Sequence, residues 1–211
     1  MAEEGHGKKY IFKIVLLGDP GVGKSSLITR FVHNRFQASY LMTIGVDILS
    51  KQLFVGKEGM VNPQEKNWTP EALEEWKKNA DEVLFLISDI GGQERFASVR
   101  EKFYRGARGC FLVFDLTRNN TLNSVKAWKK GLESVEEDVI YFLIGNKADL
   151  KEQVAVPQES IDEIIEELDL PKESFFITSA KTGEKVEEAF VTFSKELMRA
   201  VEKKRVEVGL E

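Results

Sequence analysis

The sequence has little that would support secretion, membrane insertion or a metal cluster. It contains a single cysteine, Cys110, so an internal disulfide and a cysteine-rich zinc site are excluded. It has no uninterrupted apolar run of about 18 residues, the length that suggests a transmembrane helix. Residues 1–9 are polar and lack the apolar core of a signal peptide. These absences predict a protein of the reducing cytoplasm.

Histidine is also scarce, and the 30 basic residues are outnumbered by 35 acidic ones. The net charge is −5, so broad electrostatic attraction to a nucleic acid polymer is not expected. There are only two histidines, and none lies near Cys110 in the sequence, which predicts a packed thiol rather than a nucleophile. The 211 residues, 42% of them hydrophobic, fit one large domain with a buried core.

The chain is organised around the segment Gly18-Asp19-Pro20-Gly21-Val22-Gly23-Lys24-Ser25, which has the pattern G-x-x-x-x-G-K-S of a phosphate-binding loop. An apolar run at 10–17 precedes it, and an amphipathic stretch at 26–33 follows it. In this strand–loop–helix context, the glycines let backbone N–H groups face phosphate oxygens, and the helix N-terminus adds positive potential. Lys24 is expected to neutralise the β- and γ-phosphates, and the Ser25 hydroxyl to bind Mg²⁺.

Apolar strands alternate with amphipathic helices along the rest of the chain. Further strands are expected at 46–55, 83–87, 110–114, 139–144 and 175–177. Helices are expected at 26–33, 70–78, 94–104, 121–137, 157–168 and 184–205. The helix at 70–78 should begin with Thr69 as its N-cap and Pro70 at its first position. This alternation predicts an α/β fold, a three-layer sandwich with a mostly parallel six-stranded sheet and helices on both faces.

Chemistry-bearing residues follow the expected strands at the end where such sheets bind ligands. The strand at 83–87 leads to residues 89–94 (D-I-G-G-Q-E), and the strand at 139–144 leads to 146–149 (N-K-A-D). The last strand leads to 179–181 (S-A-K). Residues such as Asn146 and Asp149 could serve only as turn residues, but four such sets in order are hard to produce by chance.

With these motifs in place, the sequence resembles the Ras superfamily of small GTPases and, within it, most closely the Rab family. The resemblance covers about residues 9–204 apart from 56–82, and it includes T-I-G-V-D at 43–47, Y-R-G-A at 104–107, L-V-F-D-L-T at 112–117 and S-V-K-A-W at 124–128. It implies the P-loop NTPase (small G-protein) fold. The implied organisation is a flexible tail at 1–8, a GTPase domain at 9–205 with a partly helical insertion at 56–82, and a C-terminal tail at 206–211.

The resemblance also implies that the nucleotide is GDP or GTP. Asp149 would accept hydrogen bonds from guanine N1 and the 2-amino group, Asn146 would contact the guanine edge, and Lys147 would lie along the ring plane. The Ala180 amide would donate to the guanine carbonyl oxygen, and Phe36 would cover the base edge-on. The implied nucleotide-binding residues are Asp19, Pro20, Gly21, Val22, Gly23, Lys24, Ser25, Ser26, Phe36, Tyr40, Thr43, Gly92, Asn146, Lys147, Asp149, Ser179, Ala180 and Lys181.

By the same resemblance, Mg²⁺ is a cofactor held by Ser25 and Thr43 and, through water, by Asp89. The Gly92 amide would bond the γ-phosphate, and Gln93 would be the catalytic residue that orients the attacking water. Because catalysis is then positioning and charge stabilisation, hydrolysis should be slow, on the order of 10⁻⁴ to 10⁻² s⁻¹. Two rival interpretations are a pseudo-GTPase that holds nucleotide without cycling, and a P-loop kinase or ATPase, for which we find no lid or acceptor site.

The implied partners are effectors, an exchange factor and a GTPase-activating protein, which would bind a monomer through residues around 40–50 and 90–105. The implied process is membrane trafficking or another signalling process. Such a protein would be cytoplasmic and peripheral to membranes through its partners. Rab proteins normally end in prenylated cysteines, but 206–211 contain none, so we expect no encoded lipid anchor.

The sequence departs from the family pattern in three places. Pro20 stands where the family usually has Gly or Ser, which should hinder stimulation by an arginine that a partner inserts. Ile90-Gly91 replaces the usual Thr-Ala, and Gly91 should loosen the second switch. The connection from Gly45 to Asp89 is longer than usual by about twenty residues, which lie in the 56–82 segment and away from the nucleotide. This insertion is either a tolerated surface loop or, given Trp68 and Trp76, a partner surface.

Overall fold

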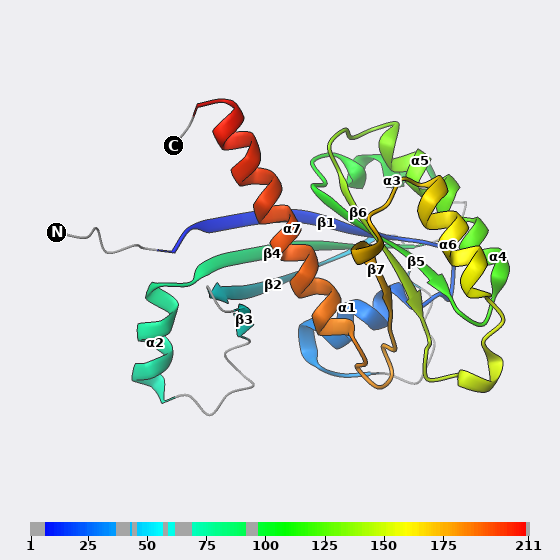
Figure 1. The fold of residues 1–211 in the computed structure, drawn as a ribbon, viewed down its shortest axis with the longest axis horizontal. Helices are drawn as coiled ribbons and strands as arrows, with labels where there is room; N and C mark the ends of the chain where they lie inside the picture. Colours follow the sequence, from blue (N-terminus) through cyan, green and yellow to red (C-terminus); the bar gives the residue numbers. More distant parts are fainter. Residues whose placement is uncertain are drawn as a thin grey trace.

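The structure, a computed structural model, describes residues 7–36, 43, 46–56, 59–61, 69–91 and 97–209. A seven-stranded sheet lies between two layers of helices (Figure 1). The strands are β1 (Lys9–Leu17), β2 (Val46–Gly56), β3 (Gly59–Val61), β4 (Asp81–Ile90), β5 (Gly109–Asp115), β6 (Ile140–Asn146) and β7 (Phe175–Ile177). The helices are α1 (Lys24–His33), α2 (Pro70–Lys78), α3 (Ala97–Tyr104), α4 (Asn119–Asn123), α5 (Val125–Glu133), α6 (Gln158–Glu167) and α7 (Val186–Glu207).

The strand order across the sheet is β3-β2-β4-β1-β5-β6-β7. β4, β1, β5, β6 and β7 run parallel to one another, whereas β2 is antiparallel to β4 and β3 is antiparallel to β2. The carboxyl ends of the parallel strands therefore meet at one edge, where ligands bind in open sheets of this kind. The expected three-layer α/β fold with a mostly parallel sheet is confirmed, and the short β3 adds a seventh strand from the inserted segment.

The two faces of the sheet bury separate hydrophobic clusters, which explains why the central strands are largely apolar. On β5, Phe111 and Val113 face the cluster under α1 and α7. The alternate residues Cys110, Leu112 and Phe114 face the cluster under α4, α5 and α6. Each fully buried aromatic or aliphatic side chain contributes about 1.5–3 kcal/mol to stability. The Cys110 thiol is buried in this second cluster, which raises its pKa well above the ordinary value, as expected for a structural cysteine.

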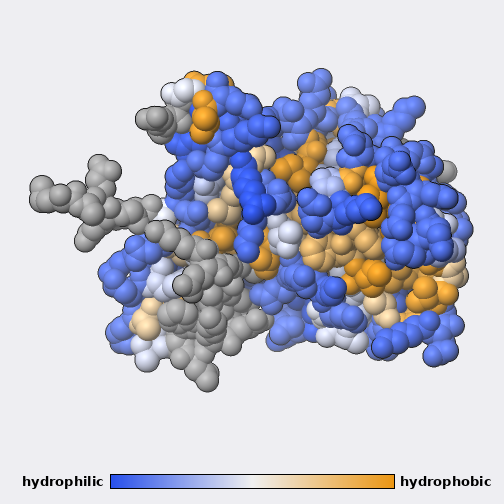
Figure 2. Space-filling view, in the orientation of Figure 1, coloured by the Kyte–Doolittle hydropathy of each residue, from blue (hydrophilic) through white to orange (hydrophobic). Residues whose placement is uncertain are grey.

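Several helices differ from the expected bounds by a few residues. The largest difference is at the helix expected over 121–137, where residues 119–133 form two helices, α4 and α5, with Ser124 between them as the C-cap of the first. The last helix, α7, continues to Glu207. Among the described residues, no helix is both long enough and apolar enough to cross a membrane. Figure 2 shows a largely hydrophilic surface on this side, with apolar side chains visible between α7 and α6.

Within the inserted segment, α2 lies at the end of the sheet opposite the phosphate-binding loop, because it precedes the first residue of β4, and β4 runs parallel to β1. α2 begins as expected: Thr69 accepts a hydrogen bond from the Ala72 N–H (3.2 Å), and Pro70 is the first helical residue. Trp76 packs edge-on against Phe54 of β2, with 6.3 Å between ring centroids. Trp76 is therefore half-buried rather than an exposed anchor, whereas Trp68 lies outside the described residues.

Candidate functional site

The phosphate-binding loop joins β1 to α1 at the carboxyl edge of the sheet. Its glycines have positive φ angles, with Gly18 at 147°, Gly21 at 77° and Gly23 at 103°. Residues other than glycine rarely adopt such angles. Gly23 is the N-cap of α1 and carries no side chain, so it leaves the N–H groups of the first helical turn for an anion. The sequence-predicted cradle is thus present in the backbone.

Lys24 lies over this loop. Its side chain is buried, with 7% of the residue exposed, and its ammonium group donates to the carbonyl oxygens of Gly18 (2.6 Å) and Asp19 (3.1 Å). A buried ammonium group needs such partners, and a phosphate group would offer it stronger, charged ones. Lys24 is therefore positioned to bind phosphate oxygens within the cradle.

Other elements hold the loop from outside. The Trp128 indole of α5 donates to the Asp19 carboxylate (2.9 Å), and Arg118 donates to the Pro20 carbonyl (3.2 Å). The Asn146 side-chain amide donates to the Val22 carbonyl (2.9 Å). These bonds fix the loop backbone before any ligand binds, which reduces the entropy cost of binding.

Three side-chain oxygens from separate segments converge beside Lys24. The Ser25 hydroxyl lies 2.8 Å from the Thr43 hydroxyl and donates to the Asp89 carboxylate, and Thr43 lies 3.3 Å from the same carboxylate oxygen. The second oxygen of Asp89 is buried and accepts no hydrogen bond from any residue that the structure describes. Burial raises the pKa of the Asp89 carboxyl, although the Ser25 hydrogen bond and the Lys24 charge oppose this effect. An all-oxygen set with an unsatisfied carboxylate fits Mg²⁺, which prefers such ligands.

The base-recognition motifs of the sequence lie together at the other end of the site. Asn146, at the end of β6, accepts a hydrogen bond from the Ala180 amide (3.2 Å). Asp149 accepts a hydrogen bond from the Ser179 hydroxyl (2.6 Å), and its other oxygen lies 3.7 Å from the Lys181 ammonium. The strand-end reasoning therefore placed β6 and β7 correctly, because their loops meet. We name residues 179–181 the base loop.

Lys147 is bound to a carboxylate that the sequence reasoning missed. Its ammonium lies 2.7 Å from Asp115, at the end of β5, and Asp115 also accepts from Arg118 (2.9 Å) and Thr117. Because Arg118 also holds Pro20, Asp115 connects the phosphate loop to Lys147. Burial raises the pKa of Asp115, but the hydrogen bonds from Lys147 and Thr117 outweigh burial and bring the pKa below its ordinary value.

Replacing Asp115 with asparagine is expected to lower the free energy of unfolding by about 1–3 kcal/mol at pH 7. The loss should be smaller than for a fully buried ion pair, because solvent screens the partly exposed Arg118 and Lys147. The folded pKa is lowered, so this stabilisation is complete above the unfolded pKa of about 3.9 and is lost as the pH falls through the folded value. Urea unfolding of both proteins measures it: their difference should shrink below about pH 4, and a difference that grew there would contradict the assignment.

For some predicted site residues, the structure does not describe the predicted contact. Phe36 is 38% exposed and lies two residues beyond Asn34, the left-handed C-cap of α1. Tyr40, Gly92 and Gln93 lie outside the described residues. The predicted catalytic glutamine and γ-phosphate contact therefore stay predictions.

Sequence reasoning missed the residues that support the site. Asp115 carried a usable signal, because it is the last residue of β5, much as Asp89 is the second-last residue of β4. Trp128 was visible as part of the S-V-K-A-W motif, but no local pattern could show that its indole N–H reaches Asp19, 109 residues away. The sequence pattern also assigned no role to Arg30, whose side chain reaches residues 180 and 181.

Comparisons with known proteins agree with this geometry. The family model of the Ras family matches residues 13–62 and 67–199, and the break falls inside the inserted segment. The chain is 36% identical over 201 residues to Ras-related protein RABA1b of Arabidopsis thaliana, covering 95% of this chain and 81% of that protein. It is 37% identical to Ras-related protein Rab11D of Lotus japonicus, over 95% and 80% of the two chains. It is 32% identical to Ras-related protein SEC4 of Saccharomyces cerevisiae, over 97% and 84%. The chain belongs to the Ras family of small GTPases, and these relatives are of the Rab type.

Proposed function

We propose that the protein is a Rab-like switch that binds GDP or GTP with Mg²⁺, hydrolyses GTP slowly and controls membrane trafficking through partners that distinguish the two states. One observation carries the proposal. Oxygens of Ser25, Thr43 and Asp89 converge beside the phosphate loop, although they belong to α1, the α1–β2 connection and β4. A ligand at this point would contact both segments that lead into the family's switches.

The residues divide the work along the nucleotide. Lys24 and the N–H groups of the loop bind and neutralise phosphate oxygens, while Asn146, Asp149 and the base loop bind guanine. Mg²⁺, when bound, supplies charge neutralisation at the β- and γ-phosphates. Ser25 and Thr43 would hold it directly, and Asp89 through water. Gln93 would orient the attacking water.

The proposed switch depends on where the Thr43 hydroxyl lies. Within the part of the chain that the structure describes, its hydroxyl contacts only Ser25 and Asp89. Contacts with Mg²⁺ and the γ-phosphate would order its segment, and hydrolysis would remove one of those contacts. Residues around 40–50 and 90–105 would then bind effectors, an exchange factor and an activating protein. The exposed Ile48 on β2, 61% accessible, supports an apolar contact there.

Single-turnover phosphate release from preloaded GTP tests the proposal. With Mg²⁺ we expect a first-order rate on the order of 10⁻⁴ to 10⁻² s⁻¹, and chelation of Mg²⁺ should stop release or expel the nucleotide. Stable GTP binding without any phosphate release would favour the pseudo-GTPase instead.

Pro20 supplies a separate prediction about the rate. Its ring is exposed at the phosphate loop, and its carbonyl is held by Arg118. Removing this bulk in Pro20→Gly is expected to raise hydrolysis at least about tenfold in the presence of a Rab-activating catalytic domain that inserts an arginine. Phosphate release measures the effect. If both the intrinsic and the stimulated rates are unchanged, Pro20 does not hinder the inserted arginine.

A further inference from the structure

Arg30 joins the helix that follows the phosphate loop to the base loop. Its Nε donates to the Ala180 carbonyl (2.9 Å), and one terminal nitrogen donates to the Lys181 carbonyl (2.6 Å). The other terminal nitrogen lies 3.2 Å from both the backbone and side-chain oxygens of Asn34. One guanidinium group therefore holds two consecutive peptide planes of the base loop and the C-cap of its own helix.

These contacts join the two ends of the nucleotide site. α1 begins at Lys24 and Ser25, beside the expected phosphates, and Arg30 lies on the same helix. One partner of Arg30 is the base loop, whose Ala180 amide donates to the Asn146 side-chain oxygen (3.2 Å). The other partner is Asn34, which lies two residues before Phe36. Arg30 therefore connects α1 to the base loop alongside Asn146, whose side chain bonds both Val22 and Ala180.

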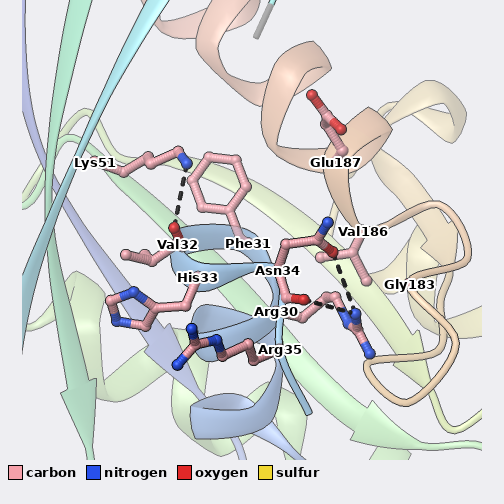
Figure 3. Close-up of a pocket in the computed structure, with 10 residues that line it drawn as sticks. All are labelled: Arg30, Phe31, Val32, His33, Asn34, Arg35, Lys51, Gly183, Val186 and Glu187. Carbon is pink, nitrogen blue, oxygen red and sulfur yellow. Dashed lines mark hydrogen bonds between the residues drawn. The ribbon is translucent and has the colours of Figure 1, made fainter. Parts of the chain in front are cut away.

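Arginine is suited to this task because its planar fork offers N–H donors in a fixed geometry, which a lysine ammonium does not. The Arg30 side chain lines a cavity of about 520 Å³ between α1, β2 and the start of α7. Figure 3 shows its guanidinium beside Asn34 and close to Gly183, at the loop that precedes α7. A β-carbon added at Gly183 would lie 3.7 Å from the Arg30 side chain, an ordinary van der Waals contact, so it is the φ of 90° that favours glycine there.

We infer that Arg30 is a positioning residue for guanine recognition: it fixes the base loop relative to the phosphate loop so that the Ala180 amide meets the carbonyl oxygen of the base. This inference rests on the proposed function. It assigns Arg30 no contact with the nucleotide, and it predicts that loss of Arg30 weakens the base contact and leaves the phosphate contacts in place.

The test compares GDP with 2-aminopurine riboside diphosphate, which carries the same phosphates but no oxygen at C6. Stopped-flow displacement gives the dissociation rate of each from wild type, Arg30→Gln and Arg30→Lys. In Arg30→Gln, GDP should leave about tenfold faster, whereas the analogue, which has no such bond to lose, should change less than about twofold. Arg30→Lys keeps the positive charge but lacks the planar guanidinium, so its GDP dissociation rate should lie between those of the wild type and Arg30→Gln. It serves as the readout if Arg30→Gln folds poorly.

A matched control is Arg199→Gln on the exposed part of α7, where Arg199 pairs with Glu196, one helical turn away, and with no other described residue. Its GDP dissociation should equal that of the wild type. Equal acceleration of both nucleotides in the Arg30 variants, or no acceleration, would overturn the inference. Failure of the wild type to bind GDP at all would instead refute the proposed function.

Discussion

Gly23→Ala is expected to lower the affinity for GDP by about a hundredfold or more. The added β-carbon would lie 2.2 Å from the Asn146 side-chain nitrogen, and residue 23 must keep a φ of 103°. Strain at such an angle costs about 1–3 kcal/mol, and losing the Asn146–Val22 hydrogen bond adds about 1–3 kcal/mol. Because Asn146 also belongs to the base end, this one methyl group should disturb both ends of the site. Isothermal titration with GDP measures the loss.

Gly106→Ala separates backbone strain from the contact with Asn146. Gly106 also has a positive φ, 77°, but an added β-carbon there would meet nothing within 4 Å among the described residues. Both variants should lose some thermal stability, because alanine is strained at either angle. Only Gly23→Ala should lose GDP affinity. Similar affinities for the two variants would show that Gly23 and Asn146 do not share a site.

Asp149→Ala is expected to lower GDP affinity by about a hundredfold and to narrow the preference for GDP over inosine diphosphate by about tenfold. Inosine lacks the 2-amino group, so the wild-type carboxylate can form two charge-assisted hydrogen bonds with guanine and only one with hypoxanthine. The Asp149 side chain is 12% exposed and is held by Ser179, so its direction is fixed before binding. Competition binding with the two nucleotides measures both effects.

Asp162→Ala serves as the control for charge removal. Asp162 is exposed on α6, and its carboxylate accepts a hydrogen bond from Gln158, one helical turn away on the same helix. Its loss should leave both nucleotide affinities unchanged. If Asp149→Ala weakens GDP and inosine diphosphate equally, the carboxylate does not contact the 2-amino group.

Local patterns were enough to predict the parallel strands, because these strands are largely apolar, and β5 and β6 are buried along almost their whole length. They also predicted α2 with its Thr69 cap, because capping is decided within about one helical turn. The strand β3 was missed, because its three residues, Gly59–Val61, begin with glycine and lack the continuous apolar run that marks the equally short β7. The break at Ser124 was missed for a similar reason: its residues stay helical in φ and ψ, so no breaker marks the boundary.

The candidate site was predictable where its chemistry lies in short motifs, and unpredictable where it depends on distant contacts. Ser25 and Asn146 belong to such motifs, and the structure places both at the carboxyl edge of the sheet. Arg30 is different, because its base-loop partners lie 150 and 151 residues away and its own neighbours in sequence form an ordinary amphipathic helix. Asp115 lies between these cases, since its strand-end position was visible but its partners were not.

The most direct test of the account is the dissociation constant of GDP against that of ADP, measured by competition on the full chain with Mg²⁺ present. The phosphate cradle alone would bind both diphosphates equally, because it contacts no base atom. Asn146, Asp149 and the base loop should favour GDP by at least about a thousandfold, since adenine offers no matching donors to Asp149 and leaves buried polar groups unpaired. Equal affinities, or tighter binding of ADP, would contradict the assignment of this edge of the sheet as a guanine nucleotide site.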